Sequence, residues 1–160
     1  MFEVFPLTYF KIDNTTNVLV TDFIRAVKLD DSLKNNELFF NIYEVLDNET
    51  PEIISYKMYG STQYHWVIML LNEKFDAYND FPKSDNIIYN YSLDKYIDIN
   101  ALHHYEDSNG NIVDQFYPLK TIISNIDYER QLNEEKRSIK ILKKEILSEF
   151  VSNYKSLISI

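Results

Sequence analysis

The sequence predicts an α+β fold, in which one short strand and two short helices are followed by a hairpin and a helical C-terminal segment. Three patterns indicate this class. A β-rich run covers residues 39–45, and two helical segments lie between Thr50 and Asn72. An Asn-Gly pair with β-rich flanks lies within residues 101–116. The 160 residues are enough for one ordinary domain, or for one small domain with an arm.

Residues 1–38 show no sustained hydrophobic period, so we expect an irregular N-terminal arm that folds against another surface. Residues 14–17 are typical of a turn, and either Thr21 or Asp22 is expected to cap a short helical piece through Val27. This region is better suited to an arm than to a hydrophobic core.

The segment 39–91 is predicted to form the core. We expect a strand over residues 39–45 and then a helix that Thr50 caps, with Pro51 in its first turn. Gly60 can adopt the left-handed conformation that ends a helix, so this helix should stop at Tyr59.

A second short helix should begin at Ser61 or Thr62 and bury a stripe of apolar residues. Trp66 belongs to this stripe, and a core position is favoured for it over a sugar-stacking platform. An aromatic loop follows, and residues 87–91 are expected to return as a strand. The stripe consists of Trp66, Val67, Leu70 and Leu71, and the aromatic loop carries Phe75, Tyr78 and Phe81.

The remaining chain is predicted to contain a hairpin and a helical arm. Residues 92–126 form a connecting segment whose hairpin turns at Asn109-Gly110. Residues 127–160 show helical spacing of apolar residues, so we expect an amphipathic helix, interrupted, if at all, near Lys143.

Composition excludes several classes of protein. The formal charge of −9 disfavours broad contact with nucleic acid or an anionic membrane. The longest apolar run is the six residues from Trp66 to Leu71, far short of the roughly 20 that span a bilayer. No basic region opens the chain, so we expect no secretory signal. Two glycines are too few for a phosphate-cradling loop, and the absence of cysteine excludes thiol chemistry.

No constellation predicts catalysis. His103 and His104 are adjacent, and neighbouring side chains of a strand point to opposite faces, so they should not chelate one ion. No Gly-x-Ser-x-Gly elbow is present, and acid pairs such as Glu134-Glu135 are expected to be solvated. We therefore expect no catalytic residue, no metal and no cofactor.

The 13 tyrosines and 10 phenylalanines are numerous for this length. Amphipathic aromatic residues are enriched at protein interfaces, which is one explanation. A large core together with a bias in codon usage is an equally good one, and the sequence leaves both open.

The run from Tyr43 to Asn72 resembles the LysM module, which is built as β-α-α-β. The matching places are a Tyr-x-Val strand, a turn before the first helix, a Tyr-Gly stop and a Leu-Asn end. Asn48 stands where the module has its turn glycine, and Asn tolerates left-handed backbone. These places are held by Tyr43, Val45, Glu49, Thr50, Ile54, Ser55, Tyr59, Gly60, Leu71 and Asn72.

The chain more closely resembles the baseplate wedge protein 53 family of T-even-like contractile-tailed phages, whose members are LysM-like. The similarity runs over roughly residues 37–150, and order and spacing make it specific. It is carried by Pro51-Glu52, Tyr59-Gly60, His65-Trp66-Val67-Ile68, Asn72, Asp76 with Tyr78, Phe81-Pro82, Ile123-Ser124-Asn125, Tyr128-Glu129, the run from Leu132 to Arg137 and Ile139-Lys140.

The resemblance implies a non-enzymatic structural protein of the virion, made and assembled in the host cytoplasm. Its partners would be other wedge and hub-proximal tail proteins in a hetero-oligomeric, six-fold assembly. The alternative is a carbohydrate-binding LysM module that attaches to peptidoglycan; a wall-degrading enzyme has no support.

Under the first reading, the chain divides into an N-terminal arm (1–38), a LysM-like core (39–91), a hairpin segment (92–126) and a C-terminal helical arm (127–160). The expected interface residues are Tyr64, Phe75, Tyr78, Phe81, Ile139, Leu142 and Ile146. The expected core residues are Tyr43, Val45, Ile54, Tyr59, Gly60, Trp66, Val67, Leu70 and Leu71.

Overall fold

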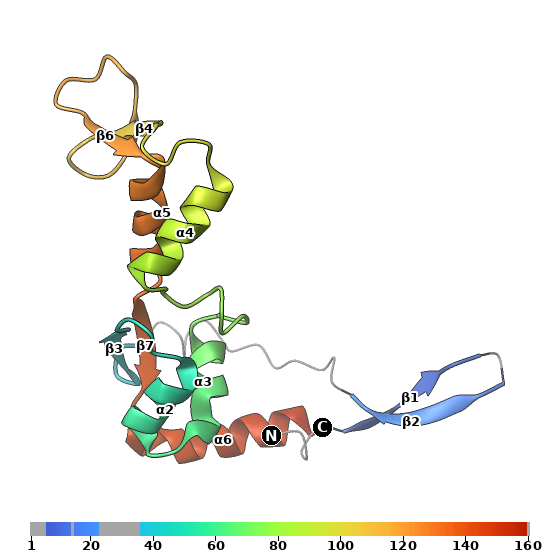
Figure 1. Ribbon diagram of the computed structural model, residues 1–160. Helices are drawn as coiled ribbons and strands as arrows, with labels where there is room; N and C mark the ends of the chain where they lie inside the picture. The colour runs from blue at the N-terminus through green and yellow to red at the C-terminus, as the bar shows by residue number, and fades with distance from the viewer. Residues whose placement is uncertain (1–5, 14, 23–35, 160) are drawn as a thin grey trace. The chain divides into compact units, whose positions relative to one another are not determined.

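A computed structural model describes residues 6–13, 15–22 and 36–159. It has the predicted α+β character, with small antiparallel sheets and short helices (Figure 1). The chain divides into two compact units. One takes in residues 1–41 and 141–160, and the other takes in residues 42–140. The four segments expected from the sequence do not coincide with this division.

The first unit contains a hairpin that the sequence did not predict. Strand β1 (Leu7–Lys11) pairs antiparallel with β2 (Asn17–Thr21), so this part of the arm is not irregular. The hairpin was missed because apolar residues point to both of its faces, which removes the alternation that marks a half-buried strand. The helical piece expected after Asp22 lies outside the described residues.

Helix α2 (Pro51–Tyr59) has the predicted bounds and the predicted ends. The Thr50 side chain accepts a hydrogen bond from the backbone N–H of Ile53, and Pro51 opens the helix. Gly60 ends it with a φ of 77°. The turn before the helix uses Asn48 at a φ of 65°, as its tolerance of left-handed backbone allows.

The second predicted helix is also present. A 3-10 turn, η2 (Thr62–Tyr64), is capped by Ser61 and leads directly into α3 (His65–Leu71). The Asn72 side chain then joins the end of α3 to a distant strand. Its Nδ2 donates to the carbonyl oxygens of Ile68 and Lys140, each at 2.8 Å, and its Oδ1 accepts from the Lys140 N–H at 2.7 Å.

Strand β3 (Phe40–Glu44) pairs with β7 (Ser138–Leu142), not with residues 87–91. The Val45 N–H donates to the Arg137 carbonyl and the Lys143 N–H donates to the Phe39 carbonyl, so the strands run antiparallel. The expected helix over residues 139–142 is therefore wrong. Ile139 and Ile141 are buried on either side of the half-buried Lys140, an alternation that the helical spacing of residues 139, 142 and 146 obscured.

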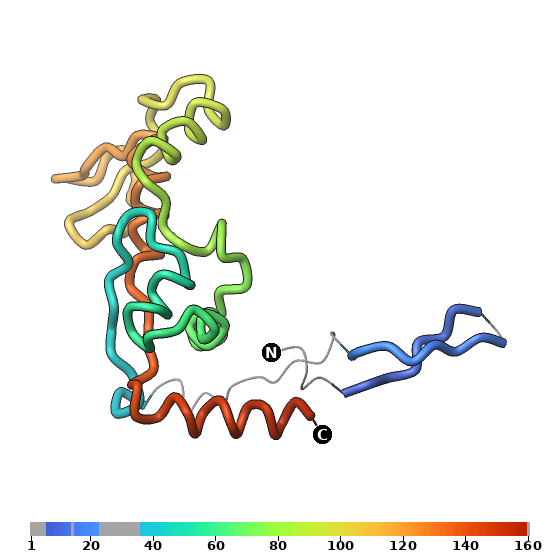
Figure 2. Tube along the Cα trace, turned by 60° about the horizontal axis from the view of Figure 1, so that its bottom comes forward, coloured from blue at the N-terminus to red at the C-terminus, as the bar shows by residue number. Residues whose placement is uncertain are grey.

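Residues 87–91 lie in helix α4 (Asp85–Lys95), and the expected strand there is wrong. A short apolar run fits a strand or a buried helix equally well, and packing decides between them. Here Ile88 and Ser92 are buried one turn apart, and α4 lies beside α5 (Asn125–Glu134), as Figures 1 and 2 both show. Ile88 and Ile126 from the two helices form a small core with Ile99.

The predicted hairpin is present as β4 (Leu102–Glu106) and β5 (Ile112–Val113), with Gly110 at a φ of 79° in the turn. Strand β6 (Thr121–Ser124) adds to the other edge of β4, giving the order β5-β4-β6. The final helix, α6 (Lys144–Ile158), buries one face at helical spacing through Leu147, Phe150, Tyr154 and Ile158.

Candidate assembly surfaces

The β1–β2 hairpin exposes apolar side chains on both faces. Tyr9 faces Leu19 across the ladder, and the next pair, Phe10 and Val18, points to the opposite face. Tyr9 is 76% exposed and Phe10 is 62% exposed. A two-stranded hairpin is marginally stable alone in water, so these faces are suited to contact with another protein.

The turn of this hairpin is held by Asp13. Its Oδ1 accepts hydrogen bonds from the backbone N–H groups of Thr15 and Thr16, each at 2.7 Å, and from the Thr15 hydroxyl at 2.8 Å. These hydrogen bonds, led by that from the Thr15 N–H, lower the pKa of the Asp13 carboxyl to about 2. The exposed strands are therefore presented by a defined turn.

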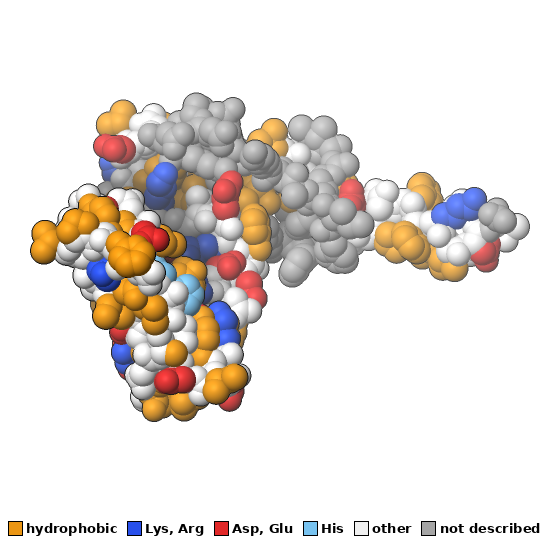
Figure 3. Space-filling view, turned by 90° about the horizontal axis from the view of Figure 1, so that it is seen from above, with side chains coloured by type: hydrophobic (Ala, Val, Ile, Leu, Met, Phe, Trp, Pro, Cys, Tyr) orange, Lys and Arg blue, Asp and Glu red, His pale blue; other side chains and the backbone are white. Residues whose placement is uncertain are grey.

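A second apolar surface covers the β5-β4-β6 sheet and the loop before β6. Leu119 is 96% exposed and Phe116 is 83% exposed. Leu119 also has a φ of 63°, a conformation that costs a non-glycine residue free energy. Figure 3 looks onto this end of the second unit and shows apolar side chains gathered near the histidines. The exposed apolar residues are Leu102, Ile112, Phe116, Tyr117, Leu119 and Ile122.

The two adjacent histidines of β4 lie on the same side, which corrects the expectation that they point apart. A bulge between Leu102 and His104 changes the register, and the two Nδ1 atoms lie 2.7 Å apart. His103 stacks on Tyr128 at 3.9 Å between ring centroids, and His104 Nε2 lies 2.8 Å from a carboxylate oxygen of Glu106. Within the described ranges, no three potential ligands are grouped to hold a metal ion.

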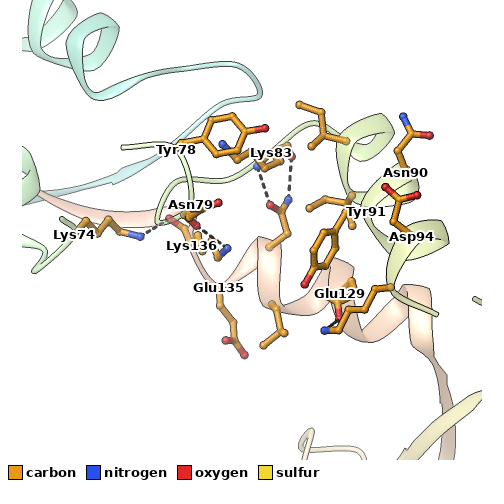
Figure 4. A pocket seen from close by; sticks show the side chains of 15 residues that line it. Lys74, Tyr78, Asn79, Lys83, Asn90, Tyr91, Asp94, Glu129, Glu135 and Lys136 are labelled. Carbon is orange, nitrogen blue, oxygen red and sulfur yellow. Dashed lines mark hydrogen bonds and ion pairs between the residues drawn. The ribbon is translucent and has the colours of Figure 1, made fainter. Parts of the chain in front are cut away.

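A groove of about 840 Å³ lies between α4, α5 and the loop that precedes α4 (Figure 4). Lys74, Lys83 and Lys136 line one end of it, and the Lys95–Glu129 ion pair lines the other. The Asn133 side chain joins α5 to the loop that precedes α4. Its Oδ1 accepts from the Lys83 N–H at 2.7 Å, and its Nδ2 donates to the Lys83 carbonyl at 3.0 Å.

The expected interface residues separate into two groups. Phe75 and Tyr78 are exposed, and Tyr64 and Ile146 are partly buried. Phe81, Ile139 and Leu142 are buried within the chain, so they are not available to a partner, which corrects that expectation. The two residues of this group in β7 were misplaced because their segment was expected to be helical.

The expected core residues lie mostly inside. Gly60 is the exception, because it is exposed at the end of α2 and acts through its backbone conformation. Trp66, Leu70 and Tyr43 are partly buried. The fully buried members are Val45, Ile54, Tyr59, Val67 and Leu71.

Three surfaces were not predicted from the sequence, for two reasons. The β1–β2 hairpin and the loop around Leu119 present apolar residues without a periodic pattern. The lysine groove is assembled from residues that are distant in sequence. The excess of aromatic residues was the available signal, and several of them, Tyr9, Phe10 and Phe116 among them, are exposed here.

Comparison with known proteins identifies the family. The sequence model described as "Base plate wedge protein 53" matches residues 2–122, which include the β1–β2 hairpin and the groove's loop. The chain belongs to this family. The family is one of structural components of the phage tail base plate, so the chain is a virion tail protein.

One curated relative of this base plate wedge protein is the baseplate wedge protein gp53 of Enterobacteria phage T4. It is 26% identical over 110 residues, which cover 66% of this chain and 54% of the relative. The chain thus aligns with about half the length of the curated relative. Neither match supports the alternative of a carbohydrate-binding module. Among the helices in the described ranges, none combines the length with the hydropathy that a membrane span needs.

Proposed function

We propose that this chain is a structural subunit that joins proteins of the base plate wedge, and joins neighbouring wedges, during tail assembly. The observation that carries the proposal is the β1–β2 hairpin, whose two faces both expose apolar residues. Burial of such surface is the main favourable term in protein association. The exposed apolar residues around Leu119 supply a second contact surface.

The proposed role is mechanical and not enzymatic. Its partners are other wedge and hub-proximal proteins, arranged with the six-fold symmetry of a contractile tail, and assembly takes place in the host cytoplasm. Membership of the family supports a structural role, and the acidic charge of −9 fits contact with proteins better than contact with DNA.

Reconstitution of the wedge tests this proposal. The double variant Tyr9→Ser/Phe10→Ser removes apolar surface from each face of the hairpin. When mixed with the other wedge proteins of the same phage, we expect this variant to enter the complex at least ten-fold more weakly, measured by sedimentation. Its thermal unfolding should match that of the unmodified chain, because both side chains are exposed.

The matched control is Tyr56→Ser, which removes an exposed tyrosine from α2 instead of from the hairpin. This variant should assemble like the unmodified chain. Normal assembly of Tyr9→Ser/Phe10→Ser would show that the hairpin is not a contact surface and would overturn the proposal.

A further inference from the structure

The lysine end of the groove gathers positive charge in an acidic protein. Lys136 donates from Nζ to the Asn79 carbonyl at 2.9 Å, and Lys74 donates to the carbonyls of Asp80 and Lys136. The Lys83 ammonium lies 3.1 Å from the centroid of the Tyr78 ring. In the part of the chain that the structure describes, no carboxylate oxygen lies within 4.0 Å of these three ammonium groups.

Asp76 and Asp80 offset this charge only in part, and their carboxylates also accept hydrogen bonds that shape the loop. Asp94 and Glu135 line the same groove. Asp80 accepts from the backbone N–H groups of Phe75 and Asp76, each at 2.8 Å. Asp76 in turn accepts from the N–H groups of Tyr78 and Asn79. Among the described residues, neither carboxylate lies within ion-pair distance of the three ammonium groups.

The lysines also disfavour one another. Burial, and then the charge of Lys136, lowers the pKa of Lys83, and Asp76 only partly offsets this. Burial lowers the pKa of Lys74 too, again assisted by Lys136 and opposed by Asp80. An anion placed among the three would relieve this repulsion and would stabilise the charged form of the lysines, which burial disfavours.

The shape of the groove indicates a peptide as the source of the anion. Beyond the lysines, the groove continues along α4 past Tyr91 (Figure 4). Ile87 of α4 and Leu132 of α5 also line it. Ile87 and Tyr91 are exposed there. Inorganic phosphate would occupy only the lysine end, whereas a peptide could place carboxylates on the lysines and apolar side chains against the helices.

We propose that this groove binds an acidic segment of a neighbouring wedge protein, in which aspartate or glutamate residues lie next to apolar ones. The inference rests on the proposed function, because the segment belongs to a partner in the wedge. The carboxylates pair with Lys83 and Lys136, and the apolar residues pack on Tyr91 and Leu132.

Carbodiimide crosslinking of the reconstituted wedge tests the pairing directly, because this reagent joins a lysine amine only to a carboxylate in contact with it. The probe is the assembled complex of this chain with the other wedge proteins of its phage. We expect Lys83 and Lys136 to crosslink to acidic residues of one segment in another wedge protein, identified by mass spectrometry. An assembled wedge in which these lysines form no such crosslink would overturn the inference.

A pair of variants gives a second readout. Lys83→Gln/Lys136→Gln removes two charges from the groove, and Lys144→Gln/Lys155→Gln removes two from exposed positions of α6. We expect the first to weaken entry into the wedge about ten-fold at low salt, and less at high salt, because salt screens charge pairs that remain in contact with water. The second should have no effect. Equal behaviour of the two variants would contradict the inference.

Competition separates the two possible sources of the anion. If these crosslinks are absent from the assembled wedge while millimolar inorganic phosphate protects the Lys83 and Lys136 amines of the free chain from acetylation, the groove is a small-anion site and the peptide proposal is wrong. If no wedge forms with the unmodified chain, it is the proposed function that fails. In that case the failure is seen as missing complex and not as missing crosslinks.

Discussion

Glu129 is a buried carboxylate that holds α4 against α5. One of its oxygens accepts from Lys95 Nζ and from the Tyr96 hydroxyl, each at 2.7 Å. Burial alone would raise the pKa of Glu129, but the hydrogen bonds from Lys95 and Tyr96 and the charge of Lys95 hold it below its ordinary value. The same contacts raise the pKa of both partners.

We therefore predict that Glu129→Gln lowers the free energy of unfolding by roughly 1–3 kcal/mol at pH 7, since one charged partner is lost. Because the folded pKa is lowered, the contribution of Glu129 is present above the unfolded pKa of about 4.3 and is lost as the pH falls through the folded value. The difference between variant and unmodified chain should thus shrink below about pH 4. Urea unfolding at several pH values measures this.

The matched control is Glu149→Gln on the exposed face of α6, which should change stability little at any pH. A difference between Glu129→Gln and the unmodified chain that stayed constant down to pH 2 would contradict the assignment of the lowered pKa.

The Leu119 side chain is almost fully exposed to solvent, and its backbone is left-handed. Both features are unfavourable for a leucine. Asn tolerates this conformation, so Leu119→Asn should raise the free energy of unfolding of the isolated chain by about 0.5–1 kcal/mol. If the apolar surface around Leu119 contacts a partner, the same variant should weaken wedge assembly. A loss of stability in urea unfolding would show that Leu119 packs within the chain.

At the scale of elements, the helices and strands that could be predicted from the sequence are those whose ends are marked by capping or turn residues. Helix α2 was predicted to the residue, because Thr50, Pro51 and Gly60 act through capping and backbone conformation that neighbours in sequence determine. The predicted hairpin at Gly110 is of the same kind. In these places, local preference and the final structure agree.

The elements that were wrong depend on partners far away in sequence. Residues 87–91 form a helix because Ile88 packs with Ile126, and residues 138–142 form a strand because β3 lies beside them. The lysine groove could not be predicted either, because Lys74 and Lys136 are far apart in sequence and lie together only in the folded chain. Short apolar runs do not specify such pairings by themselves.

Asn72 shows how one side chain joins two elements. Its amide donates to Ile68 at the end of α3 and both donates to and accepts from the backbone of Lys140 in β7. Asn72→Asp should lower the free energy of unfolding by about 2–3 kcal/mol, because a carboxylate cannot donate and would face two carbonyl oxygens.

Asn90→Asp makes the same chemical change at an exposed position of α4 and is the control for Asn72→Asp. Denaturant midpoints of the two variants should differ clearly. If they coincide, the Asn72 bridge between α3 and β7 does not contribute to stability.

At the scale of the whole molecule, the chain combines well-buried elements with surfaces that expose apolar side chains to solvent. The α2–α3 segment buries Ile54, Val67 and Ile68 almost completely, whereas the β1–β2 hairpin leaves both faces open to solvent. A wedge protein built in this way presents ready contact surfaces, and their burial would occur on assembly. The groove that Lys74, Lys83 and Lys136 line is the charged example of such an open surface.

Hydrogen exchange of the free chain and of the reconstituted wedge tests this account most directly. We predict that amides of residues 7–11 and 17–21 exchange rapidly in the free chain, because an isolated hairpin is marginally stable, and become strongly protected in the wedge. Amides of α2 and α3 should be protected in both. If the hairpin amides exchange at the same rate before and after assembly, the hairpin is not a contact surface and the central claim is wrong.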